Sequence, residues 1–245
     1  MDVRGCGIGN LVLLVAGYIR HARTVPPYLV HDTPEELAIL NLKTVKDPVE
    51  CAESGLSYMS TTDACSAFCN LRELFHPELP AIMHSIVQPP LPLPRHGADA
   101  GFCFRVTKPH LDRGYTFMSD KAIAAMMDAM HAFEKPFVCC NDAALLKKLL
   151  ASHPGAIAMP SRGTEDVRNA PDHIHQWFAL AECPIVFHGI GGGGGSGGGG
   201  EHGGSGEHGA IASTFAPTAA VYGGCRAIVG VDNDGVMYGG STYRW

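Results

Sequence analysis

The sequence has few charged residues and no strongly basic segment. Only 17% of its 245 residues are charged, and the formal net charge is −6 at pH 7 with a pI near 6.1. No run of lysine and arginine with interleaved aromatic residues occurs, and such runs are the usual electrostatic footprint of nucleic-acid-binding proteins. We therefore expect no nucleic-acid partner.

Long apolar runs are also missing. The best candidate, Ile8 to Ile19, is interrupted by Asn10 and Gly17, whereas a bilayer-spanning helix needs about 20 apolar residues. The same stretch lacks the basic n-region and the small-residue cleavage site of a signal peptide. We expect a cytoplasmic or otherwise soluble chain without a membrane segment and leave its native compartment open.

The nine cysteines form neither a dense disulfide framework nor a C-x-x-C pair, which argues for a reducing compartment and against a structural zinc site. Cys139 and Cys140 lie inside an apolar run that indicates a buried strand. Two Glu-His-Gly repeats, at 201–203 and 207–209, lie among glycines that cannot preorganise ligands. We expect no bound metal.

The 46% of hydrophobic residues is enough to build the core of one large domain or of two small lobes. A proline-rich connector at 88–94 favours two lobes, which we place at 1–97 and 98–245. The nearly pure Gly, Ser, Glu and His composition of 189–209 predicts a flexible insert in the second lobe.

After residue 100 the sequence alternates between strand-like and helical patterns. We expect strands at 101–106, 135–140, 156–159, 184–187 and 227–231, and helices at 119–133, 143–152, 172–183 and from 213 onward. Ser119–Asp120 and Asn141–Asp142 are the residue types that begin helices. This alternation predicts an α/β fold with Rossmann-like parallel sheets, whose ligands bind at the carboxyl ends of the strands.

The N-terminus predicts a short strand at Met1 to Arg4, a glycine turn at Gly5 to Asn10 and a helix that ends near Arg23. Gly7 and Gly9 let backbone N–H groups and a helix N-terminus approach an anion closely. A tight turn without any ligand explains the same residues, and we leave both interpretations open.

Arg105 lies in the apolar run from Phe102 to Val106. A buried guanidinium needs a partner, and a phosphate or carboxylate gives it a bidentate one. An exposed edge position or a structural ion pair is the competing interpretation.

Four more polar residues fall at two expected turns. Asn141 and Asp142 follow a strand, where they can bind a base or ribose or simply cap the next helix. Ser213 and Thr214 begin a helix, where their hydroxyls can donate to a diphosphate or serve as a cap.

In chain order, these features resemble the GT-B fucosyltransferase superfamily, which includes alpha-1,2-, alpha-1,6- and protein O-fucosyltransferases. Four segments, which cover most of 5–30 and 100–225, carry the resemblance. Cys6–Leu11 is similar to the family's Gly-Gly-Leu-Gly-Asn-Gln turn, and Cys103–Arg105 lies where the family has His-x-Arg-Arg at a strand end. Phe137–Asp142 resembles a strand that ends in Ser-Asp-Asp, and Trp177–Val186 with Ser213–Phe215 resembles the family's helix, strand and Ser-x-Phe segment.

The resemblance implies two lobes in a GT-B arrangement, with a small N-terminal acceptor-side lobe and a C-terminal lobe that binds a nucleotide sugar. It implies a metal-independent glycosyltransferase without a cofactor, which moves fucose from GDP-fucose to a hydroxyl of a glycan or glycoprotein acceptor. Arg105 is the expected catalytic residue, on the donor phosphates. The expected donor-site residues are Gly7, Gly9, Asn10, Arg105, Asn141, Asp142, Ser213, Thr214 and Phe215.

Three departures from the family pattern stand at Cys103, Val106 and Leu11, where the family has His, a second Arg and Gln. They keep two alternatives open: a catalytically inactive glycan- or nucleotide-binding domain of the same fold, and an α/β enzyme that uses another nucleotide. The general base stays unassigned, with His110, Asp112 and Asp120 in the right region.

Overall fold

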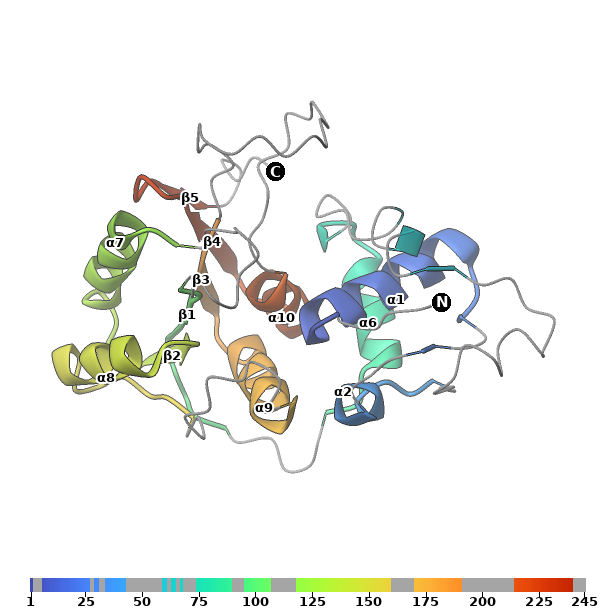
Figure 1. Cartoon of the computed structure of the whole chain (residues 1–245), viewed down its shortest axis with the longest axis horizontal. Coiled ribbons are helices and arrows are strands. Elements are labelled where there is room, and N and C mark those ends of the chain that lie inside the picture. Colours follow the sequence, from blue (N-terminus) through green and yellow to red (C-terminus); the bar gives the residue numbers. More distant parts are fainter. Residues whose placement is uncertain are drawn as a thin grey trace.

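The computed structural model describes residues 1, 6–26, 29–30, 34–42, 59–60, 63–64, 67, 74–89, 95–106, 118–159, 170–190 and 214–239. Figure 1 shows two groups of elements, a helical group and a sheet flanked by helices. The helical group contains α1 (Ile8–Ala22), α2 (Pro34–Ala38) and α6 (Leu79–Ile86). The second group contains β1 (Ala100–Phe104), α7 (Asp120–Met130), β2 (Pro136–Cys140), α8 (Ala143–Ser152), α9 (Ala170–Ala181), β3 (Ile185–Gly189), α10 (Phe215–Gly223), β4 (Ala227–Val231) and β5 (Met237–Gly239).

The five strands form one sheet in the order β2-β1-β3-β4-β5. The pairs β1–β2, β1–β3 and β3–β4 are parallel, and β5 adds an antiparallel edge to β4. From β1 the chain passes to β2 on one side, while β3 and β4 lie on the other. The order therefore reverses between β1 and β3, which is where open α/β sheets form their ligand crevice, outside the carboxyl ends of the strands.

Helices cover both faces of the sheet (Figure 1), which is why its strands are apolar on both sides. On one face Phe102 and Phe187 stack at a ring distance of 4.5 Å and pack under α7 and α8. The opposite face, with Cys103, Cys139 and Val186, packs against α9 and α10. Alternate residues of one strand thus enter two separate cores.

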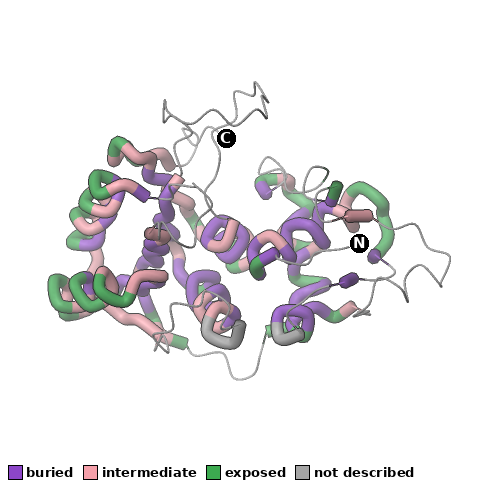
Figure 2. Tube along the Cα trace, viewed as in Figure 1, coloured by how far each residue is buried: buried purple, intermediate pink, exposed green. Residues whose placement is uncertain are grey.

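Helix α1 is apolar around its whole circumference, and every residue from Leu11 to Gly17 is buried. It contacts α6, α9 and α10, so one apolar cluster runs from the helical group to the sheet. Figure 2 shows most of α1 and α10 in the colour of buried residues. The basic residues Arg20 and His21 occupy its exposed last turn, where positive charge complements the helix dipole.

The α/β prediction with a mainly parallel sheet is confirmed. Helix α7 begins after Ser119, whose hydroxyl accepts a hydrogen bond from the Ala122 N–H group as expected of an N-cap. The strand expected at 156–159 is reduced to a single parallel bridge between Ile157 and Phe137. Helix α6 and strand β5 were not predicted.

Within the described part of 1–97 the elements are helices with an isolated bridge between Leu40 and Val87, and all named strands lie after residue 98. Residues 2–4 of the expected first strand lie outside the described residues, as do residues 191–209 of the glycine-rich insert. Gly189 belongs to β3. The division at 97 stays a prediction. No helix in the described ranges is long and apolar enough to cross a membrane.

Candidate functional site

The candidate site lies at the carboxyl edge of the sheet, between β1 and β3. Arg105 comes directly after the last residue of β1 and is half-buried, so it stands at the switch point and not inside the strand as expected. Its backbone N–H group donates to the Met118 sulfur at 3.3 Å. Burial raises the pKa of the nearby Cys103 thiol to about 12, although the positive charge of Arg105 by itself lowers that pKa.

Asn141 follows β2 and is bound to the backbone beyond β1. Its Oδ1 accepts from the Val106 N–H group at 2.8 Å, and its Nδ2 donates to the Val106 carbonyl at 3.2 Å. Asp142 caps α8, because its Oδ1 accepts from the Leu145 N–H group at 2.8 Å. The capping interpretation of Asp142 is therefore confirmed, and Asn141 has an unforeseen backbone partner.

The first turns of α1 and α10 meet at this site. Gly9 is buried, and a Cβ atom built on it would lie 2.7 Å from the backbone N and Cα of Phe215. Thr214 donates from its hydroxyl to Asn10 Oδ1 at 2.5 Å and does not cap its own helix. The structure thus brings four of the predicted residues, Gly9, Asn10, Thr214 and Phe215, together.

Gly7 differs from its neighbours in α1. It is exposed, it occupies the N-cap position without a side-chain cap, and a Cβ atom there would meet no atom of the described residues within 4 Å. The start of α1 therefore has open space beside Gly7 and tight packing at Gly9. Ser213 lies outside the described residues, as do His110 and Asp112.

His188 is a residue of this edge that sequence reasoning missed. It is the penultimate residue of β3 and is only 2% exposed, opposite Cys103 of β1 and Gly230 of β4. Burial lowers the pKa of its imidazole to about 4, and its Nδ1 lies 3.1 Å from the Gly189 carbonyl. A carbonyl only accepts, so Nδ1 carries the proton of a neutral ring.

The signal for His188 was present in the sequence. A single histidine interrupts the apolar run that begins at Ile185, directly before the glycine-rich segment. We expected the strand to end at residue 187, which placed the histidine outside it. The strand continues to Gly189.

Met118 lies across the switch point. It is 5% exposed, its sulfur accepts from the Arg105 N–H group, and a Cβ atom on Gly189 would lie 2.4 Å from its Cγ. The absence of a side chain at Gly189 therefore lets Met118 fill the space between the ends of β1 and β3. No motif in the sequence indicated this contact.

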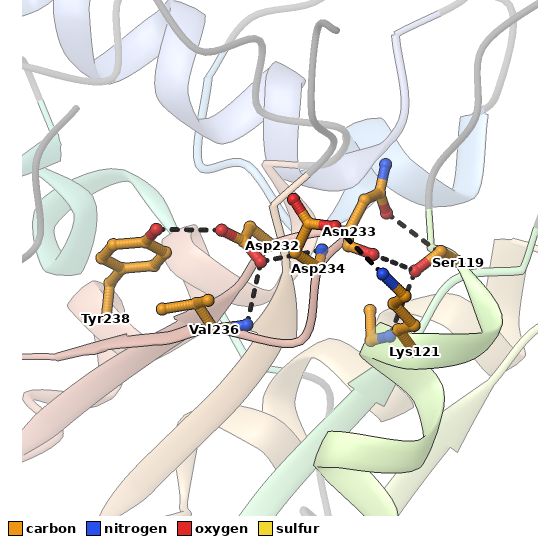
Figure 3. Close-up of polar contacts among 8 residues, drawn as sticks. Ser119, Lys121, Asp232, Asn233, Asp234, Val236 and Tyr238 are labelled. Atoms are coloured by element: carbon orange, nitrogen blue, oxygen red, sulfur yellow. Dashed lines mark hydrogen bonds and ion pairs between the residues drawn. The ribbon is translucent and has the colours of Figure 1, made fainter. Parts of the chain in front are cut away.

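Figure 3 shows how the start of α7 is held to the turn between β4 and β5. Ser119 donates from its N–H group to Asn233 Oδ1 at 3.0 Å and from its hydroxyl to the Asn233 carbonyl at 2.5 Å. Lys121 pairs with Asp234 at 3.4 Å on the surface. Asp232 accepts from the Tyr238 hydroxyl at 2.9 Å. The two contacts with Asn233 fix Ser119, the residue that follows Met118.

The described residues contain no group of three His, Cys, Asp or Glu side chains that could hold a metal ion. Asp120, the described candidate for the general base, is the exposed first residue of α7. The geometry thus offers a guanidinium, two adjoining helix starts and a neutral imidazole around one sheet edge.

No family model matches the sequence, and no curated protein matches it. Solved structures of a fucosyltransferase do match. NodZ alpha-1,6-fucosyltransferase soaked with GDP-fucose is 13% identical, with a TM-score of 0.55 over 97% of both chains. The same enzyme co-crystallized with GDP is 14% identical, with a TM-score of 0.53 over 97% of this chain and 96% of that one. Fucosyltransferase NodZ from Bradyrhizobium is 13% identical, with a TM-score of 0.51 over 97% of both chains. This likeness establishes the architecture: the chain has the GT-B fold seen in the fucosyltransferase NodZ.

Proposed function

We propose that this protein is a glycosyltransferase that moves fucose from GDP-fucose to a hydroxyl group of a glycan or glycoprotein. One observation carries the proposal: Arg105 stands at the switch point of the sheet. The fold of the chain matches that of an enzyme whose crystals contain GDP or were soaked with GDP-fucose. Ligands of open α/β sheets bind at such a point. A guanidinium there is suited to a diphosphate, which it can bind in a bidentate manner.

The chemistry asked of these residues is charge stabilisation. When the bond between sugar and diphosphate breaks, negative charge develops on the leaving GDP. The Arg105 guanidinium would bind that charge, and the positive end of the α10 dipole would add to it. The N-cap residue Thr214 makes no side-chain cap hydrogen bond to α10.

Asn10 and Thr214 have a different role in this proposal. Their side chains bind each other, and Gly9 lets the two helix starts touch. We assign these residues to the wall between donor and acceptor, with open space beside Gly7 on the acceptor side. Ser213 and Phe215 remain proposed donor-site residues. Asp142 remains one in addition to its role as the cap of α8, and would bind the guanine or the ribose.

The proposed reaction needs no metal ion or cofactor. Arg105 and the helix dipole would supply the positive charge that a divalent cation supplies in other transferases. Sugar transfer should therefore be unchanged after dialysis against EDTA. Loss of transfer on chelation, with recovery on adding Mg²⁺ or Mn²⁺, would refute this part of the proposal.

Isothermal titration with GDP tests the donor site. We expect GDP to bind better than ADP or UDP, and Arg105→Ala to weaken GDP binding by about a hundredfold, as expected for loss of a charged pair to phosphate. Arg105→Lys should retain part of the affinity, because an ammonium keeps the charge without the bidentate geometry. Equal GDP binding by the wild type and Arg105→Ala would reject the assignment.

One observation favours a second candidate, a binding domain without turnover. Cys103 stands where the related strand ends have histidine, and it is buried with a pKa raised to about 12 by that burial. A protonated thiol cannot replace an imidazole as a proton carrier near neutral pH. This candidate predicts GDP binding with no GDP release from GDP-fucose in the presence of any acceptor, and detected transfer would exclude it.

A further inference from the structure

We propose that Asn141 and Met118 are positioning residues for Arg105, an inference that rests on the proposed function of Arg105. Beyond the end of β1 two successive backbone N–H groups, those of Arg105 and Val106, are bound by side chains from distant parts of the chain, Met118 and Asn141. A strand end is normally held by its neighbouring strands. Here the described partners of these two N–H groups are side chains and not the backbone of a neighbouring strand.

Asn141 makes a two-point contact. Its amide donates to and accepts from the same residue, Val106, at 3.2 and 2.8 Å. The backbone of Asn141 also donates to the Phe104 carbonyl at 3.4 Å. Asn141 therefore extends the β1–β2 pairing by one side chain, on the C-terminal side of Arg105.

Met118 holds the preceding N–H group. Its sulfur accepts from Arg105 at 3.3 Å, while its side chain packs against Gly189 at the end of β3. Met118 is buried, and the following residue, Ser119, is bound twice to Asn233. Met118 is thus held by its side chain, which lies between the ends of β1 and β3, and by the contacts of the next residue, Ser119.

Together these contacts fix the backbone from which the Arg105 side chain leaves the sheet. A guanidinium that starts from a fixed Cα atom loses less conformational entropy on binding a diphosphate, and small displacements of such a group are costly. Asn141 would act through Arg105 and would not itself touch the nucleotide. This differs from the donor-binding role expected from the sequence.

The same pair of strands offers a matched control at its other end. Asp99, directly before β1, accepts from the N–H groups of Glu134 and Lys135, directly before β2, at 2.8 and 3.2 Å. Asp99 and Asn141 are both side-chain clamps between these two strands, at opposite edges of the sheet. Asp99→Ala should lower stability without changing GDP affinity.

A double-mutant cycle measured by titration with GDP tests the inference. We expect Asn141→Ala to weaken GDP binding about tenfold in the wild type and by less than about twofold in Arg105→Ala, since residues that act as a unit are not additive. Met118→Leu keeps the packing and removes the sulfur acceptor, and it should show the same non-additivity with a smaller effect. It serves as the test if Asn141→Ala does not fold.

The outcomes separate the two proposals. Failure of the wild type to bind GDP, or unchanged binding in Arg105→Ala, overturns the proposed function and this inference with it. If Arg105→Ala loses affinity while Asn141→Ala and Met118→Leu bind like the wild type, or weaken binding equally in both backgrounds, only the positioning role is overturned. A loss of affinity in Asp99→Ala as large as in Asn141→Ala would show general loosening of the sheet and would also overturn it.

Discussion

The Thr214 hydroxyl donates a 2.5 Å hydrogen bond to Asn10 Oδ1, and this contact joins the starts of α10 and α1 across 204 positions of sequence. Both residues were expected at the donor site as separate polar groups. In the structure they satisfy each other. Their contact defines where the helical group meets the sheet group, next to the edge that carries Arg105.

Replacing Thr214 by valine should destabilise the protein by about 1–2 kcal/mol, because the Asn10 oxygen then loses its donor in a half-buried place. Thr214→Ser keeps the hydroxyl and should unfold close to the wild-type temperature. Thermal unfolding followed by circular dichroism measures both. Valine keeps the methyl group of threonine, so a Thr214→Val protein as stable as the wild type would show that the hydrogen bond does not contribute.

Gly9→Ala should be costly for a steric reason. The new Cβ atom would lie 2.7 Å from the Phe215 backbone, so α1 and α10 must separate, at a cost of about 1–3 kcal/mol. Gly7→Ser is the matched control two residues away, since a Cβ atom meets nothing there and serine is a good N-cap residue. Urea titration of both variants gives the comparison, and a Gly9→Ala protein as stable as the wild type would contradict the close approach.

Stability should fall in mild acid because of His188. Burial lowers the pKa of this imidazole to about 4 in the folded chain, from an ordinary value of 6.5. Between these two values the unfolded chain binds more protons, so the free energy of unfolding decreases as the pH falls, by at most about 1.4 kcal/mol per pH unit. The contribution is complete above pH 6.5.

His188→Asn removes the titrating group and keeps a donor for the Gly189 carbonyl, so its unfolding free energy should depend less on pH between 4 and 6.5. Urea titrations at several pH values measure the difference from the wild type. An identical pH dependence in both proteins would mean that His188 is not buried as a neutral ring.

Local signals predicted the parts of the fold that depend on local chemistry. The Ser119 cap of α7, the apolar strand before Asn141 and the Asp142 cap of α8 all follow from residues within a few positions of each other. Helix α6 was missed because two prolines, Pro77 and Pro80, stand at its start. They indicated breaks, although proline is compatible with the first turn of a helix.

The site could be predicted only in part, for a physical reason. Sequence patterns place polar residues at strand ends, but they do not say which backbone group a side chain will bind. Asn141 binds Val106, 35 positions earlier, and Met118 reaches Gly189 through space left by a missing Cβ atom. Such pairs arise from tertiary packing, which a single sequence does not reveal.

The central claim, that Arg105 and the adjoining helix starts form the donor site of a glycosyltransferase, is tested most directly by a crystal structure of the protein with GDP. We predict that the diphosphate lies at the carboxyl edge of the sheet, between β1 and β3, with the Arg105 guanidinium bound to it and the start of α10 facing it. A nucleotide bound elsewhere, or one that leaves Arg105 untouched, would contradict the account.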